Sequence, residues 1–242
     1  MVLKGHSVKV STTSKSRFEA LTSANIKPFI INIDLLPANI TGFLQSQTLI
    51  INIPSKNLAG YRKLIENVVD SEIKNVLFVS STSVYENSNT TISESDGCES
   101  VQSPLVEIEN MIRDCSNIKS TIIRFGGLVG YSRNPGKFFK KGRVVQSAES
   151  NVNLIHRDDC IGIISRIIEQ EVWGEVFNCC ADTHPTKKEF YSHAAKSSGT
   201  PIPEFAESGD QSFKIISNQK VKQILNYEFL HPNLININFT DN

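Results

Sequence analysis

Asn75 to Glu86, reading N-V-L-F-V-S-S-T-S-V-Y-E, is the stretch that decides the fold. Its continuous apolar run from Val76 to Val79 is typical of a strand buried on both faces of a parallel sheet that helices cover. Four hydroxyl side chains follow at Ser80 to Ser83. Because open α/β sheets bind ligands beyond the carboxyl ends of their strands, we expect a site here. The alternative is a polar loop that only ends the strand.

Strand and helix patterns alternate on both sides of this stretch. Residues 57–73 carry apolar side chains at helical spacing, and Ser103-Pro104 is typical of a helix start. Such alternation predicts right-handed crossovers and a parallel sheet. The other predicted strands are 7–12, 28–33, 48–53, 120–125 and 175–179. The other predicted helices are 18–23, one capped by Asp158 and Asp159, one starting with a capping box at Thr186 and ending at Gly199, and 218–225.

The charge balance excludes several classes of partner. The chain has 25 Lys plus Arg and 25 Asp plus Glu, so it offers no general attraction for nucleic acid or an anionic membrane. We find no long apolar run or leader in its 242 residues, and therefore expect neither a spanning helix nor a secretion signal. The five cysteines are odd in number and lack metal-ligand spacing, which favours a reduced, cytoplasmic protein.

Five blocks of sequence carry a resemblance to a known family. They are F-V-S-S-T-S-V-Y-E at 78–86, I-I-R-F-G-G-L-V-G at 122–130, N-L-I-H-R-D-D-C at 153–160, V-F-N-C-C-A-D-T-H-P-T-K-K-E-F-Y at 176–191 and K-I-I-S-N-Q-K at 214–220. In this order the chain resembles the extended, atypical short-chain dehydrogenase/reductases of the NAD(P)-dependent epimerase/dehydratase type. The resemblance implies an α/β fold with a doubly wound, Rossmann-like parallel sheet and helices on both faces. It also implies a dinucleotide-binding core at 1–130, and a region at 131–242 that completes the sheet and forms a small substrate lobe.

The same resemblance implies roles for single residues. Ser81 matches the family's catalytic serine or threonine, and Asp34 matches the acid that contacts the adenine amino group. The other positions implied to bind cofactor are Ser80 at the strand end, Ile53 and Pro54 along the adenosine ribose, and Gly126 and Gly127 against the nicotinamide. His156 is interpreted as a hinge residue bonded to backbone or as a functional group. Arg124 is interpreted as a salt-bridged strand end or as an anchor for a substrate anion.

The catalytic dyad of the family, Tyr-x-x-x-Lys, has no counterpart in this chain. The matching helix has Leu105 at the tyrosine position and Glu109 at the lysine position. The chemistry needs a phenol whose pKa a neighbouring ammonium lowers, and neither residue supplies it. Tyr85 is close to Ser81 in sequence, but its family counterpart is a packing residue. By the standard chemistry we therefore expect the protein to be inactive.

The first strand and the glycine-rich phosphate loop of the family are also missing. The opening residues, M-V-L-K-G-H-S-V-K-V, match only the end of the first helix and the second strand. Since the first strand is central in such a sheet, its loss leaves two buried edges with unpaired backbone groups. Three hypotheses follow: the natural protein starts upstream of Met1, the sheet closes up, or a partner donates a strand.

The turn after the second strand predicts the preferred dinucleotide. It contains Ser11, Thr12, Lys15 and Arg17, and no acid occurs before Glu19. Hydroxyls beside cations suit a 2′-phosphate, so we predict NADP in preference to NAD if a dinucleotide binds. A solvated basic turn would explain the same residues.

The sequence leaves two functional hypotheses open. The first is an NAD(P)-binding epimerase, dehydratase or reductase whose substrate is a nucleotide sugar or similar metabolite. The alternative is a non-catalytic dinucleotide-sensing or protein-interaction module on the same fold. The expected partners are a small-molecule substrate and either a second copy of the chain or a strand-donating protein.

Overall fold

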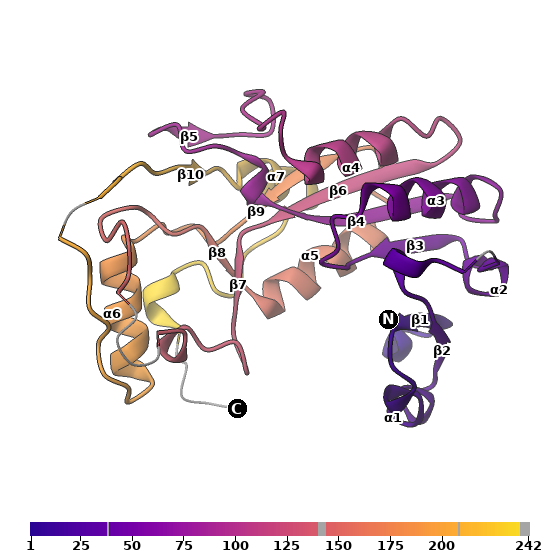
Figure 1. The fold of residues 1–242 in the computed structure, drawn as a ribbon, viewed down its shortest axis with the longest axis horizontal. Coiled ribbons are helices and arrows are strands. Elements are labelled where there is room, and N and C mark those ends of the chain that lie inside the picture. The colour runs from indigo at the N-terminus through magenta and orange to yellow at the C-terminus, as the bar shows by residue number, and fades with distance from the viewer. Residues whose placement is uncertain (38, 140–143, 208, 238–242) are drawn as a thin grey trace. The chain divides into compact units, whose positions relative to one another are not determined.

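The computed structural model describes residues 1–37, 39–139, 144–207 and 209–237 (Figure 1). The chain packs as two compact units, described here one at a time. The first contains Met1–Val79 and Val101–Ile122, and the second contains Ser80–Ser100 and Ile123–Asn242. This division reflects packing alone, so the predicted functional boundary after residue 130 stays a prediction.

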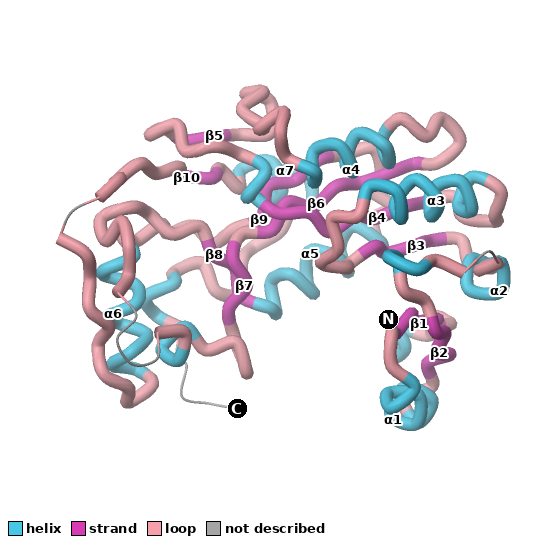
Figure 2. Tube along the Cα trace, in the orientation of Figure 1, coloured by secondary structure: helices cyan, strands magenta, loops and turns pink. Residues whose placement is uncertain are grey.

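The first unit begins with a small two-stranded sheet. A 3-10 turn at Val2–Lys4 ends at Gly5, whose φ of 82° is the left-handed conformation expected of a C-cap glycine. Strand β1 (Val8–Thr12) then pairs in parallel with β2 (Ile26–Ile30), and helix α1 (Phe18–Ser23) connects them. Figure 2 shows the two strands side by side. The strand predicted at 28–33 lies at Ile26–Ile30 instead, and it ends early because the Asn32 side chain caps a 3-10 turn at Ile33–Leu35.

The rest of the first unit is built around the strand at the start of the stretch 75–86. Helix α2 (Thr41–Leu44) precedes β3 (Thr48–Ile51), which pairs in parallel with β4 (Asn75–Ser81). Helices α3 (Leu58–Val69) and α4 (Pro104–Arg113) pack against each other. Strand β6 (Lys119–Phe125) follows, and the sheet has the order β3-β4-β6-β9. The unit boundary falls inside β4 and inside β6, so each strand contributes residues to both units.

The second unit holds the remaining strands and helices. Strand β9 (Val176–Cys179) lies at the end of the four-stranded sheet, while β7 (Gly127–Val129) pairs in parallel with β8 (Leu154–His156). A further parallel pair joins β5 (Thr91–Ile92) to β10 (Ile215–Ile216). The helices are α5 (Arg157–Glu169), α6 (Lys187–Ser197) and α7 (Gln219–Leu225). The capping box that begins α6 is confirmed, since Thr186 and Glu189 bond each other's backbone.

The α/β class with parallel pairing is therefore confirmed. In the described part of the chain the strands form four separate sheets, and the β1-β2 sheet is distinct from the β3-β4-β6-β9 sheet. The predicted cap of α5 was wrong: His156 is the N-cap, and both aspartates lie in the first turn. Among the described residues, no helix combines the length and apolar character that crossing a membrane requires.

Candidate functional site

The carboxyl end of β4 brings its hydroxyl groups to the place expected of a ligand site. Ser80 is buried and Ser81 is half-buried. The Ser81 hydroxyl accepts the N–H of Ser83 at 3.1 Å and thereby caps the 3-10 turn at Thr82–Val84. A serine hydroxyl that accepts one hydrogen bond can also donate one, but a role of Ser81 in catalysis stays a prediction.

Tyr85 is held by a buried polar network. Its side chain is 2% exposed, and its hydroxyl donates to Oδ1 of Asn178 at 2.9 Å while accepting from Arg124 Nη1 at 2.5 Å. Arg124 also bonds Glu99 at 2.5 Å, which confirms the interpretation of a salt-bridged strand end. Burial raises the pKa of Tyr85 to about 12. A phenol in this state is a poor general base at neutral pH.

Helix α4 carries the two residues at the positions predicted to match the family's dyad. Leu105 is half-buried in its first turn, and Glu109 lies one turn later with only 1% of its surface exposed. A hydrocarbon side chain transfers no proton, and a buried carboxylate raises rather than lowers the pKa of a neighbouring phenol.

The residues predicted to bind the adenosine end gather at the ends of the first strands. Asp34 is exposed and accepts hydrogen bonds from the Ser55 hydroxyl at 2.8 Å and from Asn57 Nδ2 at 3.2 Å. The predicted ribose segment, Ile53 and Pro54, immediately precedes Ser55 and is thereby brought to Asp34. The backbone of Ile31 bonds Thr12, so the ends of β1 and β2 also meet.

The basic turn after β1 is open to solvent. Ser11 and Thr12 are the last two residues of β1, and the Thr12 hydroxyl accepts the N–H of Ser14. Lys15 and Arg17 are both exposed on the 3-10 turn that follows. Their exposure leaves both interpretations open, the 2′-phosphate site and the solvated turn.

Gly126 and Gly127 have a structural explanation that involves no cofactor. A Cβ at Gly126 would lie 2.6 Å from the carbonyl oxygen of Asn153, and one at Gly127 would lie 2.6 Å from Leu154 Cδ2. The N–H of Gly127 bonds the same Asn153 carbonyl at 2.8 Å. Both glycines therefore allow the chain entering β7 to approach β8 closely. Contact with a nicotinamide stays a prediction.

The described residues fit only part of a nicotinamide dinucleotide. Asp34, together with residues 53–57, offers an exposed acceptor for an adenine amino group. No Gly-x-Gly-x-x-Gly occurs in the sequence, so the backbone cradle that usually holds the pyrophosphate is not provided. The chain thus offers an acceptor suited to adenine and no glycine-rich phosphate cradle, and no reaction step is assigned to a dinucleotide.

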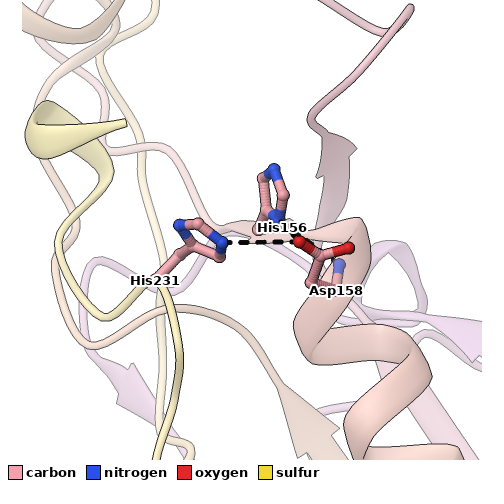
Figure 3. Close-up of side chains that lie close together, drawn as sticks. All are labelled: His156, Asp158 and His231. Carbon is pink, nitrogen blue, oxygen red and sulfur yellow. Dashed lines mark hydrogen bonds and ion pairs between the residues drawn. The ribbon is translucent and has the colours of Figure 1, made fainter. Parts of the chain in front are cut away.

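His156, Asp158 and His231 bring three titratable side chains close together in the second unit (Figure 3). Oδ2 of Asp158 lies 3.5 Å from His156 Nδ1 and 3.7 Å from His231 Nε2. Nδ1 of His156 also accepts the N–H of Asp158 at 3.3 Å, which confirms the expected backbone bond. Burial, followed by the nearby His231, lowers the pKa of His156 below its ordinary value.

Sequence reasoning missed His231, and the neighbouring Asp159 explains how it reaches the cluster. The fully buried carboxylate of Asp159 accepts the N–H of Leu230 at 2.7 Å and that of His231 at 3.1 Å. The same carboxylate accepts the Tyr227 hydroxyl at 3.0 Å. The segment 227–231 is thereby fixed to the first turn of α5. No local sequence pattern around His231 signals this tertiary contact.

Comparison with known proteins shows which proteins share this fold. No family model matches the sequence. Protein YeeZ of Escherichia coli (strain K12) is 27% identical over 245 residues, which cover 95% of this chain and 89% of that protein. UDP-glucuronic acid 4-epimerase from Bacillus cereus, solved with UDP-glucuronic acid and NAD, superposes with a TM-score of 0.79 at 16% identity, covering 96% of this chain and 88% of that one. MoeE5 with UDP-glucose and NAD gives a TM-score of 0.76 at 16% identity, covering 96% and 89%.

The comparisons bear on two predictions, the preference for NADP and the family resemblance. The dinucleotide in both of those solved complexes is NAD, so they give no support to the predicted preference for NADP. The predicted resemblance is confirmed at the level of the fold. The chain has the fold of the NAD-dependent epimerase/dehydratase, or extended short-chain dehydrogenase/reductase, proteins, and it is similar to Protein YeeZ along almost its whole length.

Proposed function

We propose that this protein binds a nucleotide, mainly through its adenosine part, and does not carry out the proton transfer of the epimerases whose fold it has. The observation that carries the proposal is helix α4, on which Leu105 and the buried Glu109 stand one turn apart. The standard chemistry places a phenol and an ammonium at this spacing. The locked hydroxyl of Tyr85, with its raised pKa of about 12, supplies no substitute.

The proposed binding group is the carboxylate of Asp34. It is exposed, and Ser55 and Asn57 orient it in the 3-10 turn that follows β2. A carboxylate acceptor suits the exocyclic amino group of adenine. The relatives of this fold that were solved with NAD and a uridine nucleotide sugar support nucleotides as the ligand class.

The test is a calorimetric titration of the full chain with NAD⁺, NADP⁺ and UDP-glucose, together with an assay for turnover of the sugar nucleotide. We expect the two adenine dinucleotides to bind and no turnover to occur. Asp34→Ala should weaken adenine-dinucleotide binding by roughly tenfold or more, the usual cost of a hydrogen bond to a charged group. The exposed Asp70, which follows the last residue of α3, provides the control variant Asp70→Ala.

Each part of the proposal can fail separately. Turnover of UDP-glucose by the unmodified chain would show that the protein is catalytic. Absence of binding to a folded sample, or equal binding by Asp34→Ala, would overturn the adenosine site. The double variant Leu105→Tyr with Glu109→Lys tests whether restoring the dyad is enough to restore activity. We expect this variant to stay inactive because no phosphate cradle is present.

A further inference from the structure

The geometry points to a site for a divalent transition-metal ion, zinc in the first instance, formed by His156, Asp158 and His231. One potential ligand atom from each of the three side chains lies within 4.8 Å of the other two. Two imidazole nitrogens and one carboxylate oxygen form a donor set that zinc and its neighbours in the first transition row prefer over magnesium or calcium.

The two distances from the Asp158 carboxylate to the imidazole nitrogens suit ligands of one ion. Oδ2 of Asp158 lies 3.5 Å from His156 Nδ1 and 3.7 Å from His231 Nε2 (Figure 3). An ion bound at about 2.1 Å from each atom would see these pairs at angles of roughly 110–125°. Those angles fall between tetrahedral and trigonal arrangements. The long 3.3 Å bond from the Asp158 N–H to His156 Nδ1 would give way to the ion.

The groups around the cluster hold the ligands as the outer contacts of a metal site do. The Tyr131 hydroxyl donates to Oδ1 of Asp158 at 2.8 Å, which fixes the carboxylate and leaves Oδ2 directed at the two imidazoles. The backbone of His231 is anchored by the buried carboxylate of Asp159. Such second contacts orient ligands and contribute strongly to metal affinity.

The exposure of the three side chains favours an open coordination site. The His156 side chain is 9% exposed, whereas those of Asp158 and His231 are each 32% exposed. An ion can therefore enter from solvent on the side of Asp158 and His231. Three protein ligands with one position left for water or an oxygen-containing ligand is the arrangement of reactive rather than purely structural zinc sites.

A metal-free explanation of the cluster exists, and it makes different predictions. The two imidazole rings lie with centroids 3.8 Å apart and planes tilted by 44°, and each ring is within ion-pair distance of Asp158. Such a cluster could serve only to fasten the 227–231 segment to α5. It would then show no selective affinity for zinc. Zinc titration therefore distinguishes the two explanations.

The experiment is a calorimetric titration of the metal-stripped full chain with ZnCl₂, with MgCl₂ titrated in parallel. We expect one zinc ion per chain and no heat from magnesium. Titration with Co²⁺ should give the visible absorption bands of a low-symmetry, four-coordinate site. His231→Gln and Asp158→Asn should each weaken zinc binding at least about tenfold. His6→Gln, at an exposed histidine outside the cluster, should bind zinc like the unmodified chain.

Circular dichroism of each variant separates loss of a ligand from loss of the fold. His231 and Asp158 are chosen because His156 is a buried helix cap whose replacement would disturb α5 directly. No zinc binding by the folded chain would overturn the metal site. Undiminished zinc binding by folded His231→Gln and Asp158→Asn variants would also overturn it. These results do not depend on nucleotide binding, because the three ligands belong to a different packing unit from Asp34.

Discussion

The hydroxyl of Tyr85 donates a hydrogen bond to Oδ1 of Asn178 across 2.9 Å, although 93 positions separate the two residues in sequence. Arg124 donates to the same hydroxyl, and the N–H of Asn178 is bonded to the Glu94 carboxylate at 2.6 Å. A buried polar chain thus links the loop after β4 to the ends of β6 and β9. Removing a partner from such a network leaves a buried polar group unsatisfied, which costs stability.

Removing the Tyr85 hydroxyl should therefore cost stability. Tyr85→Phe leaves the Asn178 oxygen without this donor, and we expect the free energy of unfolding to fall by about 1–3 kcal/mol. The matched control is Tyr61→Phe, because the Tyr61 hydroxyl is equally buried and has no hydrogen-bond partner in the described part of the chain. Its removal should be neutral or stabilising. Urea denaturation measures both, and equal costs would contradict the network.

Glu94 should make stability depend on pH. Burial raises the pKa of Glu94 above the ordinary value, opposed in part by the bond from the Asn178 N–H. The folded state then retains a proton that the unfolded state has lost, so the free energy of unfolding falls as pH rises from the ordinary to the raised value. Glu94→Gln should flatten this part of the profile, measured by urea denaturation from about pH 4 to 7. The exposed Glu149→Gln is the control, and an unaltered slope in Glu94→Gln would refute the assignment.

Asp159 should be essential for holding the segment 227–231. Asp159→Ala removes a buried acceptor from two backbone N–H groups and from the Tyr227 hydroxyl, so we expect a loss of more than about 3 kcal/mol. The exposed Asp70→Ala should be close to neutral, since a carboxylate next to a helix C-terminus is not stabilising. Chemical denaturation gives both values. A small loss in Asp159→Ala would mean that other contacts position His231.

Gly130 should be intolerant of any side chain. Its φ is +105°, and a Cβ there would lie 2.3 Å from Nε2 of His156. Gly97 also has a positive φ, of +63°, but no atom lies within 4 Å of the corresponding Cβ. Gly130→Ala should therefore cost about 1–3 kcal/mol more than Gly97→Ala, the excess being the steric term. If thermal denaturation gives the two variants equal stability, the close approach to His156 is not rigid.

The elements with a long periodic pattern were predictable from the sequence. Helix α1 was placed at its observed bounds, and the strand predicted from the apolar run 76–79 is longer in the structure, at Asn75–Ser81. Helix α3 was predicted at 57–73 against the observed Leu58–Val69. Apolar spacing alone decides such elements. The predicted helix was too long because the buried Ile73, four positions after Val69, keeps the apolar spacing although Asp70 already caps the helix.

The short and long-range features were not predictable from the sequence. Strands β5 and β10 contain two residues each, and their pairing brings Ile92 to Ile216. Two residues carry no measurable periodicity, so no local signal exists for such a pair. The candidate metal cluster was not predictable for a related reason. His156 and Asp158 lie in a recognisable block, but His231 joins them only through the tertiary contact of Asp159.

The separate β1-β2 sheet has a consequence for the exchange of backbone amide hydrogens with solvent. None of the described residues before Ile33 is buried, whereas β4 has Val76, Leu77 and Phe78 in the core. A two-stranded sheet with so little buried surface is marginal by itself, so it should open and close many times while β4 stays intact. Deuterium should therefore enter residues 8–30 by local opening, at a rate nearly independent of denaturant. It should enter β4 only through global unfolding, so the two segments report two different free energies within one chain.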